Sequence, residues 1–125
     1  MRQVRHLMIG VCAMLTVIAP AMAADDDHTV GEFLFNYQMF GQQEGSFLYG
    51  YLYGVTEGIS WTTALAHSEL GVDIYCPPEH LAGTNQMYFD ILNRYVERNP
   101  ETRARPSSTL PFVLVKALQD YYPCY

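Results

Sequence analysis

Basic residues are scarce in this chain, and their scarcity excludes whole classes of partner. Of 125 residues, 7 are Lys or Arg and 13 are Asp or Glu, so the formal net charge is −6. Two of the basic residues, Arg2 and Arg5, lie in an N-terminal segment that we expect to be removed. The remaining chain keeps five basic and all 13 acidic residues, so its charge would be −8. Such a charge argues against nucleic acid and anionic membranes and is compatible with a basic protein partner.

Long apolar runs are also rare. One runs from Leu7 to Pro20, after the basic residues Arg2 and Arg5 and before Ala21-Met22-Ala23. A basic start, a short apolar stretch and a small-x-small site are typical of a cleaved secretory signal peptide. We therefore expect residues 1–23 to be a signal peptide cleaved after Ala23, and residues 24–125 to be one exported helical domain, periplasmic and without a membrane span.

Cysteine is limited to three residues, and Cys12 lies in the expected signal peptide. Cys76 and Cys124 remain, so a single pairing is available in the oxidising compartment that export provides. Each lies beside proline at the outer end of a helical pattern. Two antiparallel helices joined by a short loop would bring these ends together, and we expect a Cys76–Cys124 disulfide to close the hairpin.

Strand signals are weak, and the apolar spacing is helical in four segments. Thr29 and Glu32 form a capping box before a helix that extends to about residue 40, with Phe33, Tyr37 and Phe40 on its apolar face. Helices are also expected over residues 46–61, from Thr84 or Asn85 to Asn99, and from Ser108 to about Tyr121. Tyr121 is placed on the buried face of the last one. These patterns predict an all-α fold, a small bundle of four main helices with one disulfide-closed helical hairpin.

Glycine recurs every four positions in the second helix, at Gly50, Gly54 and Gly58. Each interior glycine weakens a helix by about 0.5–1 kcal/mol relative to alanine, so helix propensity does not explain the three residues. A neighbouring backbone that packs closely on this stripe would explain them. The other faces are apolar nearly all round, which predicts that this helix is central in the bundle.

Short motifs along the chain occur in an order that resembles a known family. They are Gly50-Tyr51-Leu52-Tyr53-Gly54-Val55, Tyr75-Cys76-Pro77, Gln86, Tyr95-Val96-Glu97-Arg98-Asn99-Pro100-Glu101, Arg105-Pro106, Ala117-Leu118 and Tyr122-Pro123-Cys124. In order and spacing they resemble the Rap/Tai immunity proteins of type VI secretion systems, exported proteins that protect a bacterium from peptidoglycan-amidase toxins. Many relatives have a further cysteine where this chain has Phe47 or Leu48, which implies one disulfide here instead of two.

The resemblance implies a non-enzymatic protein that binds and occludes a secreted peptidoglycan amidase. The alternative is a periplasmic stress or chaperone-like protein, because small acid-stress chaperones are similar in size and helical content. The residues leave open a homodimer and imply no cofactor.

Catalytic and metal-binding patterns are missing from the sequence. Cys76 with His67 or His80 could be a nucleophile and base, but a disulfide cysteine fits the exported domain better. The histidines lack metal-ligand spacing among themselves or with the acidic residues. We therefore expect neither an active site nor a metal site.

Residues 60–73 are the least patterned part of the domain and the one surface that we select for partner binding. They offer four candidate contact residues, namely Trp61, His67, Glu69 and Asp73. Ordered loops on a rigid scaffold often carry binding function. The alternative is an ordinary connection with Trp61 packed into the core.

Overall fold

The structure is a computed structural model that describes residues 28–125, and it is all-α over that range. The four α-helices are α1 (Val30–Asn36), α2 (Phe47–Leu65), α3 (Asn85–Arg98) and α4 (Leu110–Tyr121). The π-helical turns η1 (Tyr37–Gly41) and η2 (Ala66–Leu70) extend α1 and α2, and the 3-10 turns η3 (Pro100–Ala104) and η4 (Ser107–Thr109) lie between α3 and α4. The predicted fold of four main helices is confirmed. The predicted signal peptide lies outside the described residues.

Side-chain caps begin three of the four α-helices. The capping box predicted for α1 is present, since Thr29 Oγ1 accepts from the Glu32 amide at 3.2 Å and the Thr29 amide donates to Glu32 at 2.9 Å. Ser46 caps α2 through the Tyr49 amide, and Thr84 caps α3 through the Met87 amide. Each hydroxyl satisfies an amide that has no partner inside its helix. Short polar residues therefore mark these three helix starts in the sequence itself.

The start of α4 differs from the prediction. Its N-cap residue is Thr109, without a side-chain cap hydrogen bond, and not Ser108. Pro111 occupies the first turn, where a missing amide has little effect on helix stability. The 3-10 turn η4 provides the entry to this helix in place of a hydroxyl cap.

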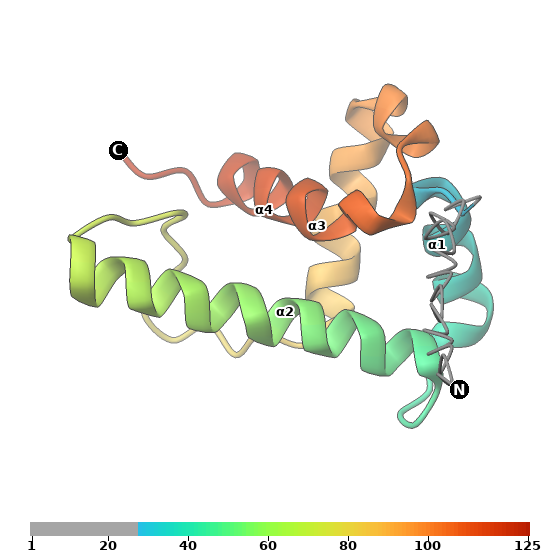
Figure 1. Cartoon of the computed structure of the whole chain (residues 1–125), viewed down its shortest axis with the longest axis horizontal. Coiled ribbons are helices and arrows are strands. Elements are labelled where there is room, and N and C mark those ends of the chain that lie inside the picture. Colours follow the sequence, from blue (N-terminus) through green and yellow to red (C-terminus); the bar gives the residue numbers. More distant parts are fainter. Residues whose placement is uncertain (1–27) are drawn as a thin grey trace, which may run out of the picture.

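The helices surround one core (Figure 1). In that view α2 lies along one long side of the molecule, α4 lies across from it, and α1 lies beside the N-terminal end of α2. The core is formed by apolar residues from all four helices together with η1 and Tyr75, namely Val30, Phe33, Leu34, Tyr37, Leu52, Ile59, Tyr75, Phe89, Ile91, Leu92, Val96, Leu110, Val113, Leu114, Ala117 and Leu118. The aromatic rings of Tyr37 and Phe89 stack at 4.7 Å between centroids and join η1 to α3. The core therefore holds α1 and η1 against the other helices.

The pair α3 and α4 departs from a simple antiparallel hairpin. Arg98, the last residue of α3, forms a 2.5 Å ion pair with Asp120, close to the end of α4. In side-by-side antiparallel helices the end of α3 would lie beside the start of α4, so this pair does not fit that arrangement. Figure 1 shows that the two helices cross. The disulfide therefore joins two non-helical segments, one before α3 and one after α4, and not the ends of the two helices themselves.

Three predictions about burial are wrong. The helix α2 is not central, because Phe47, Trp61 and Leu65 are 84%, 74% and 60% exposed. Phe40 was placed on the apolar face of the first helix and Tyr121 on the buried face of the last, but they are 68% and 43% exposed. An apolar side chain stays in solvent when no element of a small domain is available to cover it.

The packing role predicted for Gly50, Gly54 and Gly58 is also wrong within the described chain. A Cβ atom added at any of the three glycines would meet nothing within 4 Å, so no described segment packs on the stripe. Close approach occurs elsewhere. At Gly41 a Cβ atom would lie 2.7 Å from the Tyr37 ring, and at Gly31 it would lie 3.2 Å from the Arg103 carbonyl oxygen.

Candidate partner-binding surface

The connector, residues 71–84, joins the end of η2 to α3 and is fastened to the end of α4. Cys76 and Cys124 form a disulfide with an S–S distance of 2.07 Å and a Cα–Cα distance of 5.1 Å. Beside it, the Cys76 amide donates to the Tyr122 carbonyl at 2.9 Å, and Gln119 Nε2 donates to the Ile74 carbonyl at 3.1 Å. The predicted pairing is confirmed. A bridge across a sequence separation of 48 is expected to stabilise the fold by about 4 kcal/mol in the chain-entropy model.

Tyr75 anchors the connector on its inner side. Its side chain is 7% exposed and belongs to the core cluster. Burial raises the pKa of its hydroxyl, and the neighbouring Tyr88 adds to the rise. The connector is thus held at two successive residues, by the buried side chain of Tyr75 and by the disulfide at Cys76. These two anchors fix the position of the exposed residues that precede Tyr75.

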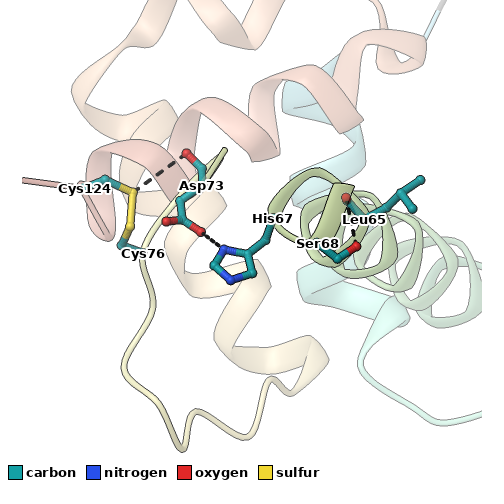
Figure 2. A network of polar contacts seen from close by, with 6 residues as sticks. All are labelled: Leu65, His67, Ser68, Asp73, Cys76 and Cys124. Carbon is teal, nitrogen blue, oxygen red and sulfur yellow. Dashed lines mark hydrogen bonds and ion pairs between the residues drawn. A yellow bond between two sulfur atoms is a disulfide. The ribbon is translucent and has the colours of Figure 1, made fainter. Parts of the chain in front are cut away.

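His67 of η2 and Asp73 of the connector contact each other (Figure 2). His67 Nδ1 lies 2.7 Å from Asp73 Oδ1, and both side chains are about half or more exposed. The chain turns between them at Gly71, whose φ of 64° is in the left-handed region that glycine favours. The Gly71 amide donates to the His67 carbonyl at 3.0 Å and so ends η2. The Asp73 carbonyl oxygen also lies 4.0 Å from Cys124 Sγ, next to the disulfide.

The four predicted contact residues separate into two places. His67 and Asp73 are brought together, and Glu69 is exposed on η2 between them in sequence. We call these three residues, which lie on η2 and at the start of the connector, the connector surface. Trp61 lies on α2 and is 74% exposed, so the alternative that it packs into the core is wrong. Among the described residues, no hydrogen bond or ion pair joins Trp61 to the other three.

Sequence reasoning missed the apolar face to which Trp61 belongs. At 100° per residue, six residues of α2 fall on one helix face, opposite the buried Leu52 and Thr56. We call this set the apolar face, and it consists of Phe47, Gly50, Gly54, Gly58, Trp61 and Leu65. Plotting all bulky residues of the helix, and not the glycines alone, would have shown that the stripe also carries large apolar side chains.

A shallow groove of about 510 Å³ runs beside this face, between α2 and α4. Its lining includes Gly54 and Gly58 from α2, Ile74 from the connector, and Pro111 and Phe112 from α4. Phe112 is 53% exposed, so the groove is open to solvent and mostly apolar. Such a surface is suited to binding another apolar surface.

Charge is unevenly distributed along the domain. Residues 28–93 contain seven acidic residues and neither Lys nor Arg, whereas the five basic residues lie between Arg94 and Lys116. Arg105 and Lys116 lie 5.7 and 5.9 Å from the centre of the Phe112 ring. The helix α2 carries one charged residue, Glu57. The connector surface is therefore in the acidic part of the chain and the apolar face is nearly uncharged.

Metal binding and nucleophilic catalysis by Cys76 were the two chemical alternatives that the sequence raised. Within residues 28–125, no group of three or more His, Cys, Asp or Glu side chains could hold a metal ion. Cys76 is in a disulfide, so it has no free thiol to act as a nucleophile beside His67 or His80. None of the helices in this range is long and apolar enough to cross a membrane.

Comparison with known proteins identifies the family. The model of the Rap1a immunity proteins matches residues 31–124, which includes α2, α3, α4, all of α1 except Val30, and both cysteines of the disulfide. Neither a curated protein nor a solved structure matches the chain. Because the match covers well over half of the sequence, the chain belongs to the Rap1a immunity protein family.

Proposed function

We propose that this protein is exported to the periplasm, where it binds a secreted peptidoglycan amidase and occludes its active site. The observation that carries the proposal is the family match over residues 31–124, since an immunity function implies a protein effector as partner. The disulfide supports export, because such bonds persist in oxidising compartments. Occlusion requires a rigid surface and no chemistry of its own.

We propose the connector surface as the part that contacts the amidase. It is exposed, yet it is held by the disulfide, by Tyr75 in the core and by the His67–Asp73 contact. A surface that is already ordered loses little conformational entropy on binding. Its acidic residues Glu69 and Asp73 would attract a basic rim around the amidase cleft, and added salt would weaken that attraction.

Co-expression in the periplasm tests the function. Cells that produce a type VI amidase effector encoded beside this gene should survive when the protein is present and lyse when it is absent. Loss of residues 1–23 should abolish protection while the protein still accumulates in the cytoplasm. A folded, exported protein that protects against none of the amidase effectors encoded beside it would contradict the immunity function.

The chaperone-like alternative has a distinct outcome in the same strains. It would be favoured if the protein failed to protect yet reduced aggregation of unrelated periplasmic proteins at low pH. No described contact specifically favours that function.

A matched pair of charge reversals tests the surface. Glu69 and Glu44 are both exposed glutamates, located beyond opposite ends of α2. We expect Glu69→Lys to weaken amidase binding at least tenfold and Glu44→Lys to change it less than twofold, as measured by titration calorimetry. Equal affinities of the two variants would exclude the connector surface and leave the immunity function standing.

A further inference from the structure

Two basic residues beside the groove between α2 and α4 have no acidic partner. Arg105 and Lys116 are exposed, and neither side chain forms an ion pair within residues 28–125. The guanidinium carbon of Arg105 lies 5.7 Å from the centre of the Phe112 ring, and the Lys116 nitrogen lies 5.9 Å from it. Phe112 is itself a wall residue of the groove. Two positive charges therefore border one side of the groove in a protein whose net charge is negative.

The groove itself is apolar and uncharged. Its volume is about 510 Å³, and none of the residues that line it is Asp, Glu, Lys, Arg or His. Binding sites for small ligands typically have about 300–1,000 Å³, mostly apolar walls and a few polar groups that fix the orientation of the ligand. The hydroxyl groups of Thr62 and Thr63 in the wall already donate to the Gly58 and Ile59 carbonyls. The two cations beside Phe112 are therefore the polar groups with which a ligand in the groove could pair.

This arrangement fits a ligand with an apolar tail and an acidic head. The tail would cover the half-buried side chains of Ile74 and Val115, which otherwise remain in contact with water. An acidic head at Phe112 would be within reach of Arg105 and Lys116, because both side chains have long flexible stems. A guanidinium group matches a carboxylate with two parallel N–H bonds, and an ammonium group adds a compact positive charge.

Acidic side chains do not oppose such a ligand. Glu57, the one charged residue of α2, lies about 140° around the helix axis from Thr62 at 100° per residue, so it is on another face. Asp120 of α4, four positions after Lys116, is paired with Arg98. At physiological ionic strength, salt screens exposed charges beyond about 8 Å. The nearby cations therefore act more strongly on a head group at Phe112 than the net charge of the protein does.

We propose that the groove between α2 and α4 binds a free single-chain amphiphile with a carboxylate head group, such as a long-chain fatty acid. The carboxylate pairs with Arg105 and Lys116, and the chain lies along Ile74 and Val115. A membrane surface presents head groups and keeps its chains inside the bilayer, whereas this groove has room for a chain. The proposal does not depend on the effector, since no residue of the connector surface lines the groove.

Titration calorimetry with dodecanoate below its micelle concentration tests the ligand class. We expect saturable binding of one dodecanoate per chain, which weakens with added salt. Dodecyltrimethylammonium has the same chain and the opposite charge, and it should bind at least tenfold more weakly. Equal affinities for the two amphiphiles, or no binding of dodecanoate, would overturn the proposal. Binding to phosphatidylglycerol vesicles without binding of dodecanoate would indicate a membrane surface and would also overturn it.

A matched pair of charge reversals tests the head-group site. Arg94 of α3 is also exposed and has no ion pair within the described chain, but it does not line the groove. We expect Lys116→Glu to weaken dodecanoate binding at least tenfold and Arg94→Glu to change it less than twofold. Circular dichroism should show native helix content in both variants, because both positions are exposed. Equal losses of affinity would show that only net charge matters and would overturn the assignment of the head-group site.

Two tryptophan substitutions test whether the chain lies in the groove. Thr62 is exposed and lines the groove, so Thr62→Trp should fill it and abolish dodecanoate binding. Ala64 is also exposed on α2 but lies about 160° around the helix axis from Thr62, and Ala64→Trp should bind dodecanoate as the parent protein does. Thermal unfolding checks that both variants are folded. Binding of dodecanoate to folded Thr62→Trp with the parent affinity would place the chain elsewhere and overturn the proposal.

Discussion

The two faces of α2 both carry large apolar side chains but have different surroundings. On the inner face Leu52 is fully buried, and Thr56 and Ile59 are at most 9% exposed. On the outer face Phe47 and Trp61 extend into solvent beside glycines that touch nothing. Hydrophobicity identifies a surface that can be buried, and only the position of the other helices determines which surface the monomer buries. The remaining apolar surface is then available to a partner.

The largest difference between the faces should appear in a pair of alanine substitutions. We expect Leu52→Ala to lower the free energy of unfolding by about 2–5 kcal/mol, because it leaves a cavity in the core. Trp61→Ala removes a larger side chain but should change the free energy of unfolding of the monomer by less than about 0.5 kcal/mol. Urea denaturation at low protein concentration, where a dimer would dissociate, measures both. A larger loss for Trp61→Ala would mean that the outer face is covered within one copy.

A second comparison concerns Gly41, where an added Cβ atom would be crowded by Tyr37 and Leu48. We expect Gly41→Ala to destabilise the fold by about 1–3 kcal/mol. The added methyl group would lie 2.7 Å from Tyr37 Cδ2 and 3.0 Å from Leu48 Cβ, and the buried Tyr37 ring has little room to move. Thermal unfolding monitored by circular dichroism provides the measurement. An unchanged melting temperature would show that η1 can shift away from α2.

On the outer face of α2, replacing glycine by alanine should raise the stability of the monomer and not lower it. Gly54→Ala meets nothing within 4 Å and replaces a poor helix former with a good one. We expect the monomer to gain about 0.5–1 kcal/mol. The same melts, made at low protein concentration, report this gain. A destabilised monomer would mean that another part of the chain packs on the stripe.

A smaller effect, confined to alkaline pH, should distinguish the tyrosines that face the core. Burial raises the pKa values of Tyr37 and Tyr75 above their ordinary value of 10.0. The unfolded chain then loses these protons at lower pH than the folded protein does. The associated stability is fully present below pH 10 and is lost as pH rises through the folded pKa values.

Urea denaturation across pH 8 to 11.5 tests this dependence. We expect Tyr75→Phe to reduce the loss of stability above about pH 10 relative to the parent protein. Identical pH profiles for the two proteins would show that the Tyr75 hydroxyl does not titrate differently in the folded and unfolded states.

Local signals were the part of the structure that could be predicted. The capping box at Thr29 and Glu32, the cap at Thr84 and the pairing of Cys76 with Cys124 all occur as expected. Each depends on a few neighbouring residues or on the lack of an alternative partner. The predicted end of the second helix near Trp61 is wrong, because α2 continues to Leu65 and η2 to Leu70. Thr62 and Thr63 stay in the helix and donate their hydroxyl hydrogen bonds to Gly58 and Ile59 carbonyl groups one turn earlier.

Part of the candidate site also followed from the sequence. The unpatterned stretch before Cys76 does place His67, Glu69 and Asp73 at an exposed end of α2. The 2.7 Å contact between His67 and Asp73 depends on the turn at Gly71, which spacing alone did not indicate. The position of Trp61 depends on the rotation of α2 about its axis.

The sequence by itself determined the all-α class, the capped starts of the first three helices and the single disulfide, because these depend on local hydrogen bonding and on the one pairing that two cysteines allow. Tertiary structure alone decided that α3 and α4 cross, that the close glycines are Gly31, Gly41 and Gly83, and that the stripe from Gly50 to Gly58 faces solvent. The physical reason is that α2 is apolar nearly all round. Its sequence therefore provides several equivalent faces for burial, and the packing of the other helices selects one of them.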